Sequence, residues 1–181
     1  MGTKTRVGLI LVVLLGVACG GSPTPTAAMS PVAASTADAA TVTYVALVRG
    51  YWTDILAADG ATGSTNEASR ACLGTLTNSA PPNAALIEPA LCHTHAVAIL
   101  SIQLTFLDDL KGTIAPEQFA DDDRVFRSQV PRAITAMKAL VSVSTTSNKQ
   151  AIFDASNAYV DIMLGSVIPA MDDVDPATKH Y

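Results

Sequence analysis

The sequence has 181 residues, of which 49% are hydrophobic and only 5% are aromatic. The formal net charge is −5 at pH 7 and no run of Lys and Arg forms a basic patch, which argues against nucleic acid or anionic lipid headgroups as partners. Abundant Ala and scarce aromatics favour close-packed helices over a β-sheet.

The N-terminus has the pattern of a secretory signal. Lys4 and Arg6 precede an uninterrupted apolar run over residues 7–18. A helix of that length spans roughly 18 Å, well short of a bilayer core of about 30 Å. The pattern therefore predicts a signal peptide over residues 1–18 rather than a transmembrane anchor. Cleavage after Ala18 would remove both cations and no acid, leaving a net charge of −7.

A cysteine directly follows this apolar run. Val17-Ala18-Cys19 resembles the end of a bacterial lipobox, with Gly16 at a position where Leu is usual. The resemblance covers residues 1–19. It implies that the Cys19 thiol receives a diacylglycerol with fatty acyl chains such as palmitate, and that the lipid anchors the mature chain to the extracytoplasmic side of a cell membrane or to the cell surface. Ordinary secretion with an unmodified Cys19 is the alternative.

The segment after Cys19 is low in charge and rich in Gly, Ser, Pro, Thr and Ala. Such a composition cannot bury enough apolar surface to offset its ordering entropy, so residues 19–40 are predicted to form a disordered tether. Residues 41–181 are then predicted to form a single domain, since about 140 residues suffice for one core and not for two.

Two cysteines remain once Cys19 is assigned to the lipid. In an exported protein, Cys72 and Cys92 are expected to form a disulfide, because such bonds persist in oxidising compartments. The bond would close a loop of about 20 residues and stabilise the fold by roughly 3 kcal/mol. A thiolate metal site is the alternative.

The first two predicted helices are separated by a long crossover. Two adjoining stripes of apolar residues at helical spacing predict a helix over residues 41–58: Tyr44, Val48, Tyr51 and Ile55 form one, and Val45, Trp52 and Leu56 form the other. The Ser64–Glu67 capping-box spacing predicts one short helix in the crossover, running to about Leu76.

Three further long helices follow. The second major helix is expected to start near Ala84 or Pro89 and to end at Lys111, and its nearly continuous apolar surface predicts that it is the most buried element. The next opens at residues 116–117 and should kink or split at Pro131. The last begins with a capping box at residues 147–150 and is expected to end at Pro169 and then at residues 175–176. The fold class is thus an all-α, four-helix-type bundle with one short extra helix, stapled by a disulfide.

The only local cluster of metal-ligating residue types is Cys92-His93-Thr94-His95. Cys92 and His95 are three residues apart and share a helix face with Glu88, so a soft metal could be held there. His93 points about 200° away from His95 around a helix. A disulfide at Cys92 would leave a histidine-only site.

Catalytic patterns are lacking in the sequence. There is no Gly-x-Ser-x-Gly nucleophile elbow and no phosphate-binding glycine loop, and only three histidines could act as a base. The acidic runs 121–123 and 172–175 lack the alternating ligands of a calcium loop and are interpreted as solvated helix ends. Tyr44, Tyr51, Trp52 and Tyr159 are interpreted as core residues, with a pocket lining as the alternative.

The resulting hypothesis is an envelope lipoprotein whose helical bundle binds or scaffolds, without catalysis and without a cofactor. The expected partners are the membrane, through the lipid, and an envelope protein or small apolar ligand, but not nucleic acid. The alternative is a metal- or haem-binding redox module that uses His95 with His93, Cys92 or Glu88.

Overall fold

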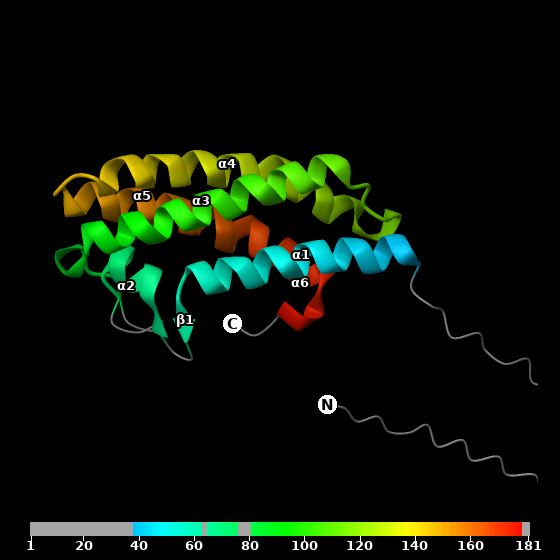
Figure 1. Ribbon diagram of the computed structural model, residues 1–181, viewed down its shortest axis with the longest axis horizontal. Coiled ribbons are helices and arrows are strands. Elements are labelled where there is room, and N and C mark those ends of the chain that lie inside the picture. The colour runs from blue at the N-terminus through cyan, green and yellow to red at the C-terminus, as the bar shows by residue number, and fades with distance from the viewer. Residues whose placement is uncertain (1–37, 63–64, 76–80, 179–181) are drawn as a thin grey trace, which may run out of the picture. The chain divides into compact units, whose positions relative to one another are not determined.

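The computed structural model describes residues 38–62, 65–75 and 81–178 (Figure 1). The predicted signal peptide, the predicted acylation site Cys19 and the predicted helix cap Ser64 lie outside these residues.

The described residues form six α-helices and a short strand pair. The helices are α1 (Ala39–Ala58), α2 (Glu67–Leu73), α3 (Pro89–Gly112), α4 (Ala120–Ser144), α5 (Lys149–Ile162) and α6 (Ile168–Val174), and a π-helical turn, Met163–Val167, joins the last two. The strands β1 (Ala61–Thr62) and β2 (Thr65–Asn66) pair antiparallel. Single 3₁₀ turns cover Ala84–Leu86, Glu117–Phe119 and Pro176–Thr178.

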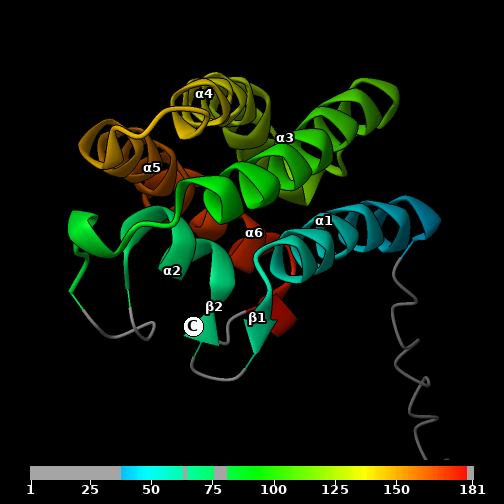
Figure 2. The same cartoon turned by 60° about the vertical axis from the view of Figure 1, so that its left-hand side comes forward.

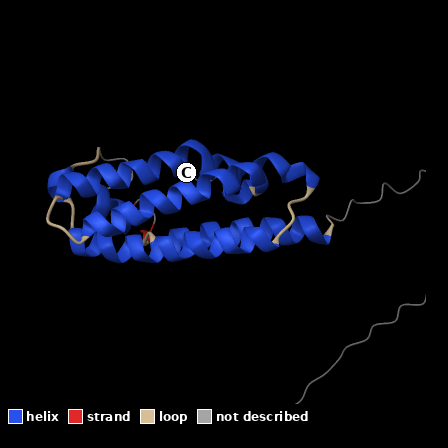
Figure 3. Ribbon diagram, turned by 90° about the horizontal axis from the view of Figure 1, so that it is seen from above, coloured by secondary structure: helices blue, strands red, loops and turns tan. Residues whose placement is uncertain are grey.

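The long helices lie along one common direction and form a bundle (Figure 3). In the bundle α4 packs between α3 and α5, α1 packs on α3 and α6, and the short α2 packs on α3 and α5. This arrangement confirms the predicted all-α bundle with one short extra helix in its first crossover.

One core runs through the bundle. From α1 it takes the predicted stripe of Tyr44, Val48, Tyr51 and Ile55, all buried. The Tyr51 ring stacks on the Phe106 ring at a centroid distance of 4.0 Å, and Phe106 meets Phe126 edge to face at 5.7 Å. These aromatic contacts join α1, α3 and α4.

Helix α1 begins at Ala39, two residues before the predicted start. The Asp38 side chain accepts a hydrogen bond of 2.7 Å from the Thr41 backbone N–H and so caps the helix. Ala39 and Ala40 therefore belong to α1 and not to the tether.

Helix α2 is shorter than predicted at both ends. Asn66 caps it, since its side chain accepts from the Ser69 N–H at 2.7 Å, and Glu67 is its first residue rather than the partner of a capping Ser64. The helix ends at Leu73 because Gly74 adopts a φ of 66°. A Cβ on residue 74 would lie 1.9 Å from the Asn83 carbonyl oxygen, so the chain can turn here only with glycine.

Helix α3 begins at Pro89, one of the two predicted starts. The prediction that α3 is the most buried element is wrong: Val97 and Leu104 are 46% and 44% exposed. Only one side of α3 faces the core, because α3 lies at the edge of the bundle, flanked by α1 and α4, and its outer face meets solvent.

Two prolines are accommodated inside helices. Helix α4 continues through Pro131 and does not split there. Asn148, not Ser147, caps α5, and the last helix continues past Pro169 to Val174. A π-helical turn lies directly before Pro169, which has no N–H to donate. In this turn the Ile168 N–H donates to the Met163 carbonyl oxygen five residues earlier, so the helix continues through the proline.

Two helical segments, Pro89–Gly112 and Lys149–Val174, are long and apolar enough to cross a membrane by length and composition alone. Both contribute side chains to the bundle core, and core helices of soluble proteins have the same composition.

Candidate functional site

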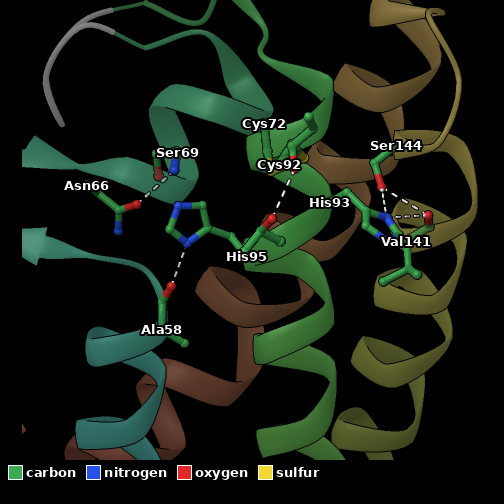
Figure 4. Close-up of a disulfide and its surroundings, with 11 residues drawn as sticks. Ala58, Asn66, Ser69, Cys72, Cys92, His93, His95, Val141 and Ser144 are labelled. Carbon is green, nitrogen blue, oxygen red and sulfur yellow. Dashed lines mark hydrogen bonds between the residues drawn. A yellow bond between two sulfur atoms is a disulfide. The ribbon is translucent and has the colours of Figure 1, made fainter.

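Cys72 and Cys92 form the predicted disulfide, with their Cα atoms 4.9 Å apart (Figure 4). The bond joins α2 to the first turn of α3, and both cysteines are buried. It therefore fixes the crossover to the bundle where the crossover re-enters it.

The two histidines that follow Cys92 point to different sides of α3 (Figure 4). His93 Nδ1 lies 3.0 Å from Ser144 Oγ and 3.2 Å from the Val141 carbonyl oxygen, both on α4. His95 Nδ1 donates to the Ala58 carbonyl oxygen at the end of α1, at 2.7 Å. The divergence agrees with the helical spacing, and each ring joins α3 to a neighbouring helix.

The predicted ligand residues Glu88, Cys92, His93 and His95 are not brought to one point. The Cys92 sulfur is in the disulfide, and Glu88 is an exposed residue directly before α3. Within the described ranges, no group of three or more His, Cys, Asp or Glu side chains is arranged to hold a metal ion.

His95 lies instead beside two acidic residues that the sequence did not point to. Its Nε2 is buried without a hydrogen-bond partner among the described residues and lies 3.9 Å from Glu67 Oε2. Asp59, the C-cap of α1, accepts a hydrogen bond from Asn66 Nδ2 at 3.2 Å. Burial raises the pKa of Asp59 to about 6, and the Asn66 amide and His95 offset only part of that rise.

A second polar group lies deeper in the core. Gln103 is fully buried, and its Nε2 donates to the Tyr159 hydroxyl at 2.9 Å. Gln103 Oε1 and the Tyr51 hydroxyl are buried without a partner in the described part of the chain. Burial raises the pKa of both tyrosines, so both stay neutral.

A cavity of about 60 Å³ lies beside this polar group and under the disulfide. Asp59, Ser69, Ser156 and Tyr159 supply its polar lining, and the other lining side chains are apolar. A space of this size holds one or two water molecules rather than an organic ligand.

Two larger depressions open at the surface. The first, of about 590 Å³, lies at one end of the bundle over Pro89, His93, Lys149 and the α4–α5 turn. Lys149 Nζ there donates to the Ala85 carbonyl oxygen at 2.9 Å. The second, of about 250 Å³, is a groove between α1 and α3.

The interpretation of the acidic runs 121–123 and 172–175 as solvated helix ends is only partly correct, because each run contains one carboxylate that binds residues of other elements. Asp175 is 3% exposed and accepts from Arg49 Nε at 2.6 Å and from Arg49 Nη2 at 3.0 Å. Asp123 accepts from the Tyr44 hydroxyl at 3.0 Å and from Arg127 Nε at 2.6 Å. Both carboxylates tie α1 to later parts of the chain.

Of the four aromatic residues considered as core or pocket lining, Tyr44, Tyr51 and Tyr159 are buried and Trp52 is half-buried. The core interpretation therefore holds for the tyrosines, although Tyr51 also lines the α1–α3 groove and Tyr159 the small cavity.

Comparisons of the chain with protein-family models, with curated proteins and with solved structures found no match.

Proposed function

We propose that this protein is a lipid-anchored envelope lipoprotein whose helical bundle is a non-enzymatic binding domain. The lipid is attached at Cys19, and the domain faces the extracytoplasmic side of the membrane. In this role the acyl chains hold the protein at the membrane and the surface of the bundle meets its ligand.

The disulfide is the observation that carries the proposal. Cys72 and Cys92 are paired and buried, and such bonds persist in exported proteins and are rare in the reducing cytosol. The signal-like sequence ending at Cys19 accounts for export. Of the three cysteines in the sequence, Cys19 is the one that does not belong to this disulfide.

The placement of α1 also supports a tethered domain. The helix begins at Ala39, 20 residues after Cys19 in the sequence. A chain of that length and composition has a typical reach of roughly 25 Å, which keeps the bundle near the membrane without embedding it.

A binding role is supported by the two depressions that open at the surface. His93 and His95 bond to backbone and serine groups, and Ser144, the serine beside His93, is buried and donates its hydroxyl to the Val141 carbonyl oxygen. The geometry therefore favours binding over catalysis.

The test is to express the full chain in a bacterium that processes lipoproteins and to determine the mass of its N-terminal peptide. The expected peptide begins at Cys19 and carries a diacylglyceryl group, and the protein sediments with membranes. The Cys19→Ala variant should lose both properties and keep its helical circular dichroism spectrum. A wild-type protein recovered from the soluble fraction with an unmodified Cys19 contradicts the proposal.

A further inference from the structure

Helices α1 and α3 run antiparallel, side by side (Figures 1 and 2). An open groove lies between them. The stacked rings of Tyr51 and Phe106 form its floor. The residues along its walls are small and exposed: Ala46 and Gly50 on α1, and Ser101 and Thr105 on α3. The groove is therefore narrow, apolar at its base and open to solvent along its length.

Each end of the groove carries one carboxylate. Tyr51 lies against Phe106, so in this antiparallel pair Asp54 lies near Ser101 at one end and Asp109 lies near Ala46 at the other. With Tyr51 against Phe106, the position opposite Asp54 is six residues before Asp109 on α3, which separates the two acids by about 9 Å along the helix axis.

Neither carboxylate has an ion-pair or hydrogen-bond partner in the described part of the chain. The cations nearest in sequence are engaged elsewhere, because Arg49 binds Asp175 and Lys111 binds Asp108. The groove thus presents two unneutralised negative charges, one at each end of an apolar floor.

The fold does not require the glycine in the wall. Gly50 lies within α1, and a Cβ on it would meet no atom within 4 Å. Glycine costs an α-helix about 1 kcal/mol relative to alanine. Its effect here is to keep the groove open, which a side chain at this position would narrow.

We propose that the α1–α3 groove binds a linear aliphatic diamine or polyamine. Its terminal ammonium groups pair with Asp54 and Asp109, and its methylene chain lies along the floor formed by Tyr51 and Phe106. The proposal rests on the binding role proposed above and names its ligand class, but it does not depend on the lipid at Cys19.

The charges also argue against two other occupants. A second copy of the same face would bring two further unpaired carboxylates towards Asp54 and Asp109, and like charges repel. An anionic or purely apolar ligand would leave both carboxylates without a counterion.

The test is to titrate the purified full chain, in a mild non-ionic detergent, with α,ω-diamines from diaminobutane to diaminodecane and with hexylamine as the monoamine control. Calorimetry gives the affinity, and amide chemical-shift changes locate the site. Affinity is expected to peak where the ammonium separation matches about 9 Å, and hexylamine should bind more weakly. Shifts should centre on residues 46–54 and 101–109.

Three variants give the expected losses. Asp54→Asn and Asp109→Asn should each lower the affinity for the tightest-binding diamine by up to about five-fold. Asp161 is exposed and lies outside the groove, so Asp161→Asn should leave this affinity unchanged. Gly50→Leu should abolish binding and leave the thermal transition intact or raised, since the added side chain points into open space.

Several outcomes would overturn the proposal: no binding, equal affinity for every chain length and for hexylamine, or shifts centred away from the groove. Binding of a basic helical peptide such as a Lys/Leu repeat, with no binding of the diamines, would assign the groove to a protein partner instead. The mass of the Cys19 peptide reports on anchoring separately, so failure at the groove and failure of the lipoprotein proposal are distinguishable.

Discussion

Two regions of the bundle are held together by different chemistry. In the crossover region, residues 59–95, a buried disulfide joins α2 to α3. In the α1 ion-pair region, Arg49 binds Asp175 after α6, and Tyr44 with Arg127 binds Asp123 on α4. Only the first region should respond to reductant, because the disulfide lies in it.

The two regions also contain aspartates with opposite pKa shifts. Burial raises the pKa of Asp59 above its ordinary value of 3.8, to about 6. The hydrogen bonds from Arg49 lower the pKa of Asp175. Folding therefore favours the protonated form of Asp59 and the ionised form of Asp175, and the two regions should differ in the sign of their response to pH.

The largest expected effect is removal of the disulfide. The double substitution Cys72→Ala/Cys92→Ala should lower the free energy of unfolding by about 3 kcal/mol, because the unfolded chain regains the freedom of a loop of about 20 residues. Urea denaturation followed by circular dichroism measures the loss. Reductant should destabilise the wild-type protein similarly and leave the double variant unchanged. A loss below about 1 kcal/mol would show that packing alone holds the crossover.

The next effect is a gain in stability at Asp59. Between about pH 4 and pH 6 the folded protein binds more protons at this group than the unfolded chain, so stability falls as pH rises through this window and stays lower above it. Asp59→Asn should therefore stabilise the protein at pH 8 by about 1–2 kcal/mol and change little at pH 4. Denaturation at both pH values checks this, with Asp161→Asn as control, and equal gains at both would refute it.

Asp175→Asn should act in the opposite direction. The variant loses charge-assisted hydrogen bonds to Arg49 at a nearly fully buried side chain, so its free energy of unfolding at pH 7 should fall by about 1–2 kcal/mol. The wild-type advantage should persist down to about pH 4 and disappear only as pH falls through the lowered pKa of Asp175. A wild-type advantage that disappears on raising the pH would contradict this assignment.

The sequence predicted the features that depend on local periodicity. The α1 stripe and the opposite directions of His93 and His95 follow from 3.6 residues per turn. Pro89 was one of the two predicted starts of α3, because proline suits the first turn of a helix. The disulfide followed from the number of cysteines and the expected compartment.

Other features depend on contacts between distant residues. Asn66 caps α2, and its amide also donates to the Asp59 carboxylate before the strand pair. Gln103 lies four residues after Ile99 and three before Phe106, so it shares their buried face of α3. This spacing was the one sequence signal that a polar residue of α3 would be buried. Asp54 and Asp109 are 55 positions apart in the sequence, and only the register of α1 on α3 brings them to the two ends of one groove, which no local pattern encodes.

The smallest expected effect tests the wall of the groove, which lies outside both regions. Gly50→Ala should raise the free energy of unfolding by about 0.5–1 kcal/mol, because the helix gains propensity and the added methyl group meets no neighbour. The gain should be the same at pH 4 and pH 8 and in the Cys72→Ala/Cys92→Ala background, since the added methyl group meets neither the disulfide nor a titrating carboxylate. Urea denaturation under these conditions measures it. A lower free energy of unfolding would mean that the fold requires glycine at this position. A higher free energy of unfolding together with weaker diamine binding would show that Gly50 favours ligand binding at a cost in helix stability.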